Sequence, residues 1–307
     1  MRSTVYSNIV SMFYMNDRPQ VPFHPNHVSF KKLVLYALEK SFNDFNFRTL
    51  TKTNAFKEEY TAWETQENAI RKAQKQNKQP QNPEPKMTAY LIDRLDTCGF
   101  LDRFVDYFKA AAPDQSQFDH WHNKTCEQFL EILDGAKAYT NYTKAYTGLA
   151  YGKAQKIVNM MFKHLYCIDG ADRYDDYFKH CHMVLDNFTL EWFKRTLGEK
   201  RIDFWSNLIY KDPSVDHNDY MFYQVKIRQY FLPTNSQKHT YAGLTPFQAE
   251  FYIWPEIQWQ MATADLINQN LLADVMRSGT KIVKDPDIVA KCDSLLQQLT
   301  ALQHMYR

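Results

Sequence analysis

Apolar and aromatic residues recur every three or four positions along most of this chain, which is the spacing of one face of an α-helix. This pattern predicts helices over 26–50, 54–75, 87–112, 114–137, 152–165, 187–197, 203–210, 215–231, 256–277 and 286–303. A further apolar and aromatic run over 246–254 fits either a helix or an extended segment. The sequence therefore predicts an all-α protein with a multi-helix globular fold.

The most apolar of these helices follows a short glycine turn at Gly152 and continues over 157–165. A helix that is apolar on every side is buried, so we expect this one to lie at the centre of the fold. Two lysines, Lys153 and Lys156, stand at its entrance. The next strongly patterned helix begins after Asp186, which is flanked by apolar residues on both sides.

One polar stretch breaks the helical pattern clearly. Residues 74–86 contain three prolines and no large apolar side chain, a composition typical of a flexible loop or linker. It predicts an N-terminal helical region over 1–79, a linker or loop over 80–86, and a helical core over 87–307. A single domain with a mobile loop is the alternative. A second polar stretch, 167–181, reads as a loop.

Composition narrows the possible classes of protein. The 307 residues are enough to bury a core, and 8 glycines are too few for a fold built on tight β-turns. A net charge of +2 lacks the basic excess of strong non-specific nucleic-acid binders, although a local basic face remains compatible with it.

The cellular setting is also indicated by sequence. Five widely spaced cysteines favour a reduced, cytoplasmic location. No stretch approaches 18 continuous apolar residues, and the N-terminus lacks a basic region followed by an apolar run. We therefore expect neither a membrane-spanning helix nor a signal peptide.

The lysines and the aspartate are the candidates for chemistry. A lysine amine attacks a carbon centre only when it is neutral, and burial near a helix N-terminus favours the neutral form. The plainer alternative for Lys153 and Lys156 is a solvated pair, or a pair that binds phosphate together with the helix amides. Asp186 is placed to cap its helix, and a capped, rigid carboxylate suits the stabilisation of a cationic transition state.

The order of these features resembles the helix-hairpin-helix-Gly/Pro-Asp DNA glycosylase superfamily, and within it the archaeal oxidised-guanine glycosylase/lyases. The resemblance covers about 148–197 and is carried by Gln155-Lys156-Ile157-Val158 and Val184-Leu185-Asp186, with Lys156 and Asp186 30 residues apart (186 − 156). Residues 148–152 depart from the usual Gly-apolar-Gly hairpin, and the proline common before the aspartate is absent. The absence of a four-cysteine cluster excludes the iron–sulfur branch.

This resemblance implies a helix-hairpin-helix glycosylase-like fold and excision of a damaged or modified base from duplex or single-stranded DNA. The base would have to leave the stack to be reached. Lys156 would be the nucleophile, Asp186 the assisting carboxylate and Lys153 the fallback nucleophile, with no cofactor and no metal. Substrate contacts are expected from five neighbours of this pair: Tyr151, Gly152, Gln155, Trp192 and Arg195.

Two other interpretations stay open. The chain could be a non-catalytic helical module that binds nucleic acid or protein, for instance in a bacterial or phage defence system, with a structural Lys/Asp pair. It could also be a metal enzyme that uses His122, Cys126 and the run 180–182, although zinc sites favour more regular Cys/His pairs. The oligomeric state is left open.

Overall fold

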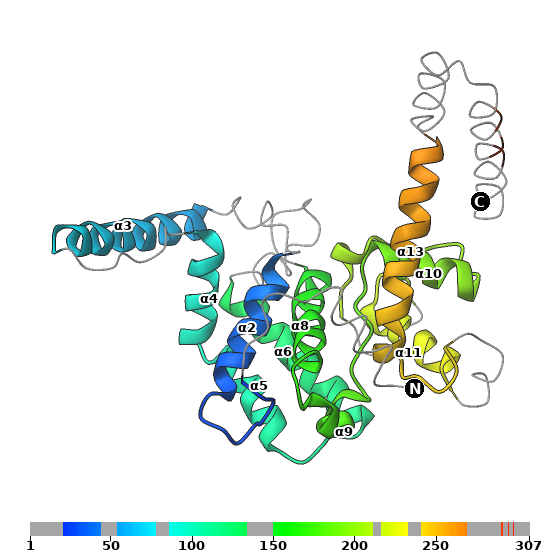
Figure 1. Cartoon of the computed structure of the whole chain (residues 1–307), viewed down its shortest axis with the longest axis horizontal. Coiled ribbons are helices and arrows are strands. Elements are labelled where there is room, and N and C mark those ends of the chain that lie inside the picture. The colour runs from blue at the N-terminus through cyan, green and yellow to red at the C-terminus, as the bar shows by residue number, and fades with distance from the viewer. Residues whose placement is uncertain are drawn as a thin grey trace. The chain divides into compact units, whose positions relative to one another are not determined.

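The computed structural model describes residues 21–43, 54–77, 86–133, 150–210, 216–232 and 241–268, together with positions 290, 294 and 297. Over these residues the chain forms ten α-helices and two 3-10 helices and no β-strand (Figure 1). A single parallel bridge joins Ile209 to Asp219. The predicted all-α class is confirmed, and the helix-hairpin-helix topology stays a prediction.

The chain divides into two compact units, Met1–Glu250 and Phe251–Arg307. Apart from Lys86, the predicted linker 80–86 lies outside the described residues, so the domain boundary there stays a prediction. Within the parts that the structure describes, no helix is long and apolar enough to cross a membrane.

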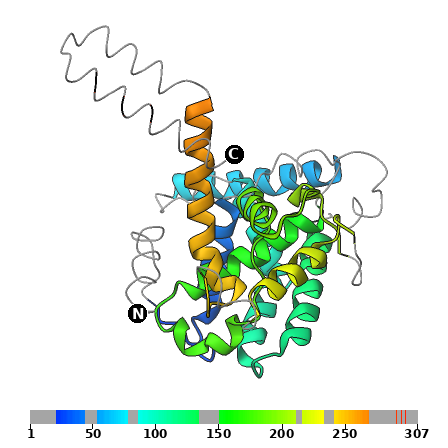
Figure 2. The ribbon, with the colours of Figure 1, turned by 90° about the vertical axis from the view of Figure 1, so that its right-hand side faces the viewer.

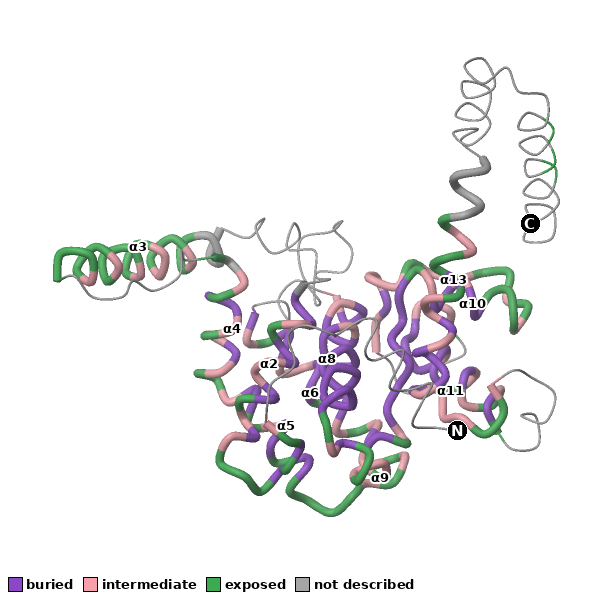
Figure 3. The backbone as a smooth tube through the Cα atoms, in the orientation of Figure 1, coloured by how far each residue is buried: buried purple, intermediate pink, exposed green. Residues whose placement is uncertain are grey.

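Helix α8 (Tyr151–Tyr166) is the buried centre of the first unit, as its sequence predicted (Figure 3). Of its 16 residues, 14 are buried, which leaves almost no face for solvent. Helices α2 (Phe30–Asn43) and α6 (Gln115–Ile132) pack against it, and α5 (Phe100–Lys109) packs against both of them (Figure 2). This central position means that side chains on different faces of α8 reach different neighbouring elements.

Aromatic rings fill the space between these helices. The ring of Phe162 on α8 meets six others at centroid distances of 5.4 to 6.3 Å, in the tilted and edge-to-face arrangements that aromatic pairs prefer. The six belong to Phe104, Tyr107, Phe108, Phe118, Trp121 and Phe178. Much of the aromatic content of the chain therefore serves the core.

The helix predicted over 87–112 is two helices, α4 (Met87–Thr97) and α5, so the single helix was wrong. Gly99 between them has a φ of 75°, a left-handed conformation that glycine adopts without steric cost. Apolar residues keep their helical spacing across this glycine, which is why the pattern alone missed the turn. Helix α3 (Asn54–Gln76) lies where it was predicted and is largely exposed (Figure 3).

Two other predictions need correction. The predicted loop 167–181 contains a 3-10 helix, η2 (Ala171–Tyr174), and a short helix, α9 (Asp175–Phe178). The predicted helix 203–210 forms only one 3-10 turn, η3 (Trp205–Asn207), after which the backbone of Ile209 pairs with the segment before α11 (Tyr220–Tyr230).

At the C-terminal end, the run 246–254 is helical and belongs to α13 (Pro246–Asn268), which continues through Pro255. The predicted helix 286–303 lies outside the described residues except for its three single positions.

Candidate active site

Lys156 and Asp186 come together in the structure. The Nζ atom of Lys156 lies 3.8 Å from Oδ2 of Asp186, and the two side chains are 15% and 8% exposed. Lys156 belongs to the second turn of α8, and Asp186 immediately precedes α10 (Asn187–Leu197). The distance fits an ion pair rather than a short hydrogen bond, so a modest movement would let the amine turn towards another partner.

The carboxylate of Asp186 is held by the helix that it caps. Its Oδ1 accepts hydrogen bonds from the backbone N–H of Phe188 at 2.9 Å and of Thr189 at 3.1 Å. In return, Oγ1 of Thr189 accepts from the backbone N–H of Asp186 at 2.9 Å, which completes a capping box. The predicted N-cap is confirmed, and the geometry directs Oδ1 to the helix amides and Oδ2 to Lys156.

Trp205 lies beside both lysines. Its ring centroid is 5.1 Å from Nζ of Lys153 and 5.0 Å from Nζ of Lys156, within the range of a cation–π interaction. Burial lowers the pKa of Lys153, and the positive charge of Lys156 lowers it further. The two lysines considered as nucleophiles thus share one aromatic neighbour.

Gly152 explains how Trp205 reaches this position. A Cβ atom at Gly152 would overlap the backbone carbonyl oxygen of Trp205, so only glycine allows this close approach. The N–H of Gly152 donates to the carbonyl of Leu208 at 3.0 Å. The predicted glycine turn before the helix is wrong, because α8 already begins at Tyr151, and Gly152 serves packing.

The other expected substrate contacts are placed as follows. Tyr151 and Trp192 are buried, at 1% and 4% exposure, in aromatic clusters of the core. Arg195 is exposed on α10, where its Nε donates to Glu191 at 2.7 Å. Gln155 is completely buried and bonds to the backbone of Leu185.

The segment that delivers Asp186 is buried and extended, with its backbone groups bonded to side chains instead of a β-ladder. Gln224 donates to the carbonyl of Met183 at 2.8 Å, and the N–H of Val184 donates to Oε2 of Glu250 at 2.8 Å. The carbonyl of Val184 accepts from Thr189 at 2.6 Å. Buried backbone groups require such partners, so these side chains satisfy the polar backbone groups of the extended segment.

Glu250 also forms a buried ion pair with α8. Its Oε1 lies 2.7 Å from Nζ of Lys163, and the side chains are 0% and 9% exposed. Burial raises the pKa of Glu250, while Lys163 and the N–H of Val184 act in the opposite direction. Helix α8, the extended segment before Asp186 and helix α13 therefore meet at the Glu250 carboxylate.

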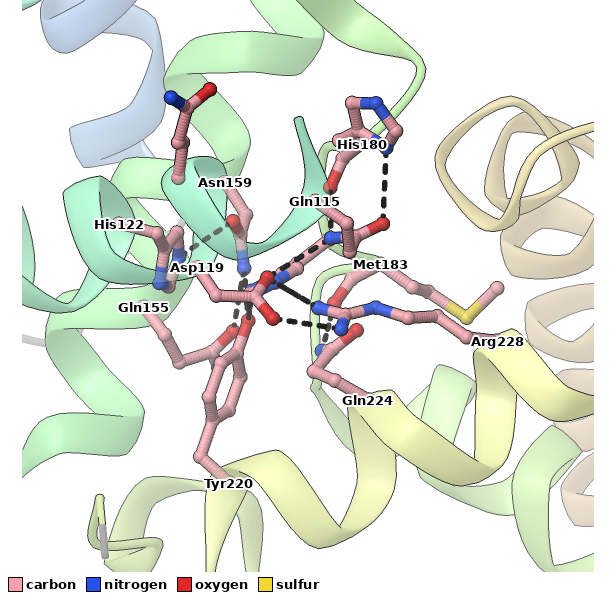
Figure 4. Close-up of polar contacts among 12 residues, drawn as sticks. Gln115, Asp119, His122, Gln155, Asn159, His180, Met183, Tyr220, Gln224 and Arg228 are labelled. Atoms are coloured by element: carbon pink, nitrogen blue, oxygen red, sulfur yellow. Dashed lines mark hydrogen bonds and ion pairs between the residues drawn. The ribbon is translucent and has the colours of Figure 1, made fainter. Parts of the chain in front are cut away.

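A continuous hydrogen-bond network runs from Gln155 to the half-buried Arg228 (Figure 4). Asn159 donates to Gln155 at 3.0 Å and to the hydroxyl of Tyr220 at 2.9 Å. His182 joins Tyr220 at 2.8 Å through Nδ1 and Asp119 at 2.8 Å through Nε2. Arg228 donates to both carboxylate oxygens of Asp119.

The two contacts of His182 Nε2 place opposite demands on its proton. A carboxylate only accepts, so the contact with Asp119 calls for a proton on Nε2, whereas Nη2 of Arg228, 2.6 Å from the same nitrogen, only donates and calls for an unprotonated Nε2. Burial lowers the pKa of His182 to about 4. Burial opposes ionisation of Asp119, but His182 and Arg228 outweigh it and hold the pKa of Asp119 well below its usual range.

His122 and Cys126, two of the residues considered above as metal ligands, are packed inside the core beside this network. His122 bonds to Asn159 at 2.9 Å and lies against Cys126, and both residues are completely buried. Across the parts of the chain that the structure describes, no group of three or more His, Cys, Asp or Glu residues is arranged to hold a metal ion.

No protein-family model, curated protein or solved structure matches this chain.

Proposed function

We propose that this protein is a DNA glycosylase of helix-hairpin-helix type that excises a damaged or modified base, with Lys156 as nucleophile and Asp186 as assisting carboxylate. The observation that carries the proposal is the 3.8 Å approach of Lys156 Nζ to Asp186 Oδ2. These residues are 30 positions apart (186 − 156), and each belongs to the start of a different helix.

The geometry suits attack on a sugar carbon. The neutral amine of Lys156 would bond to the anomeric carbon, and the bond to the base would break with its electron pair leaving on the base. The amine then loses one proton, and the departed base takes one up. The nitrogen lone pair next breaks the bond between the anomeric carbon and the ring oxygen, the ring oxygen takes up a proton, and a protonated Schiff base results. Asp186, fixed by its cap, would stabilise the positive charge that develops on the sugar.

The surroundings of Lys156 support binding of an anionic strand. Lys153 adds a second positive charge at the start of α8, where the helix dipole also favours anions. Its lowered pKa makes it the alternative nucleophile at the same place.

The rival interpretation is a non-catalytic helical module that binds nucleic acid or protein. A largely buried contact between Lys156 and Asp186 would then only tie α8 to α10. The two interpretations differ in one property, which is whether a DNA strand becomes covalently attached.

The test uses oligonucleotides with an abasic site or an 8-oxoguanine, both single-stranded and duplex, incubated with the full chain and borohydride. We expect a trapped protein–DNA product from the wild type, its loss in Lys156→Met, and its retention in the matched neighbour variant Lys153→Met. Base release is measured in parallel on oligonucleotides with oxidised, deaminated and alkylated bases. Binding without base release or trapping on any of them would refute the glycosylase and favour the module.

A further inference from the structure

Gln155 uses its whole hydrogen-bonding capacity on two separate stretches of backbone and one side chain. Its Nε2 donates to the carbonyls of Gly152 at 2.9 Å and Leu185 at 2.8 Å. Its Oε1 accepts from the N–H of Leu185 at 3.3 Å and from Asn159 at 3.0 Å. A primary amide has two donors and one oxygen with two lone pairs, so no bonding position is left over.

These bonds connect the two halves of the proposed site. Leu185 directly precedes Asp186, and it is held through both its N–H and its carbonyl, as a neighbouring β-strand would hold it. Gly152 lies in the first turn of α8, the turn before Lys156. The Gln155 amide thus fixes the position of the residue before Asp186 against the helix that carries Lys156.

We infer that Gln155 is a positioning residue, which sets the separation between the Lys156 amine and the Asp186 carboxylate without touching the substrate. The inference deepens the proposed glycosylase function and rests on it for its catalytic consequence. Its geometric content, that Gln155 holds these two groups together, is independent of what the site does.

The chemistry requires a glutamine at this position. Leucine has a similar volume, but it leaves the two carbonyls and the N–H of Leu185 buried without the partners that they have now. Glutamate keeps the length and the acceptor for the N–H of Leu185, but it has no N–H for either carbonyl. Both changes should therefore release the segment that ends in Asp186.

Gln224 provides a matched control. It is 1% exposed and also donates to this segment, at the carbonyl of Met183 at 2.8 Å. It belongs to α11 rather than α8, and it acts three residues before Asp186 (186 − 183). Gln224→Leu removes a comparable buried amide without loosening the link between α8 and Leu185.

The first test is geometric and needs no substrate. Crystal structures of Gln155→Leu and Gln224→Leu are compared for the distance from Lys156 Nζ to Asp186 Oδ2. We expect the 3.8 Å approach to persist in Gln224→Leu and to open beyond ion-pair range in Gln155→Leu. Gln155→Glu is the second variant if the leucine variant does not fold. An unchanged distance in the Gln155 variant would overturn the inference.

The second test is kinetic and uses the abasic-site duplex with borohydride under single-turnover conditions. We expect Gln155→Leu to slow trapping by on the order of a hundredfold, since misplacement of about 1 Å has effects of that size. The affinity of Gln155→Leu for the duplex should equal that of the wild type. Gln224→Leu should keep both the trapping rate and the affinity of the wild type. Equal slowing in both variants would mean that Gln155 only supports the fold, and it would overturn the positioning role. If the wild type traps no strand while the distances change as expected, the proposed function fails and the positioning role stands.

Discussion

Removal of Lys163 from its buried pair with Glu250 should destabilise the first unit strongly. The Glu250 carboxylate is 0% exposed, and Lys163 lies 2.7 Å from it. In Lys163→Met the carboxylate keeps its bond from the N–H of Val184 but loses its counter-charge. A buried charge that loses its partner typically costs about 3–5 kcal/mol. For a domain of this size that corresponds to a fall in melting temperature on the order of 10 °C.

The loss should depend on pH in a definite direction. Burial already raises the pKa of Glu250 with Lys163 present, and removal of the lysine should raise it further. A carboxyl group whose pKa is higher in the folded state stabilises the fold at low pH and loses that contribution as pH rises through the folded value. The difference in stability between Lys163→Met and wild type should therefore shrink on acidification from pH 8 to 5, by at most about 1.4 kcal/mol per pH unit.

Urea unfolding followed by circular dichroism at pH 8 and pH 5 measures both quantities. The double variant Lys163→Met/Glu250→Gln is the control, because it removes both charges and keeps an oxygen to accept from Val184. We expect it to be more stable at pH 8 than Lys163→Met alone. A single variant that loses less than about 1 kcal/mol, or the same amount at both pH values, would refute the assignment of a buried, charge-dependent pair.

The other predictions concern packing, capping and acid stability. Gly152→Ala should lower the free energy of unfolding by at least about 1–3 kcal/mol because its Cβ meets the carbonyl of Trp205, and an unchanged melting temperature would contradict that close approach. Asp186→Ala should cost about 1 kcal/mol in urea unfolding through loss of the cap, whereas Asp186→Asn keeps the cap and should cost little stability while losing base release. Lowering the pH from 7.5 to 5 should cost about 2 kcal/mol through His182, whose pKa falls from 6.5 unfolded to about 4 folded, so the unfolded chain binds the extra proton first. His182→Gln should show a correspondingly shallower pH dependence in the same unfolding measurement, and an equal slope in both proteins would contradict the buried neutral histidine.

The parts of the fold that could be predicted are those fixed by local sequence. The continuous apolar run of α8 predicted its burial, and Asp186 before an apolar stretch predicted an N-cap. Local patterns failed where a single residue changes the path of an otherwise helical stretch. Gly99 interrupts one helix while the apolar spacing continues across it, and the aromatic run at Trp205 forms only a single turn.

The surroundings of the site depended on contacts between distant residues. The resemblance suggested Lys156 and Asp186 together, but the contact of Trp205 with both lysines follows from the close approach of its backbone to Gly152, which joins distant residues. Gln155 was expected to contact substrate, whereas it bonds to the backbone of Leu185, because its direction from α8 is set by tertiary packing. A buried glutamine within an apolar helix was the available signal, since such an amide must find partners inside the protein.

The most direct test of the central claim is to map the amino acid that carries the DNA. The borohydride-trapped product of the wild type with an abasic-site duplex is digested with protease, and the peptide that bears the nucleotide is sequenced by mass spectrometry. The Lys156–Asp186 pairing predicts that the modified residue is Lys156. A modification at Lys153 or at a lysine elsewhere would contradict it. So would the absence of a trapped product from a protein that binds the duplex.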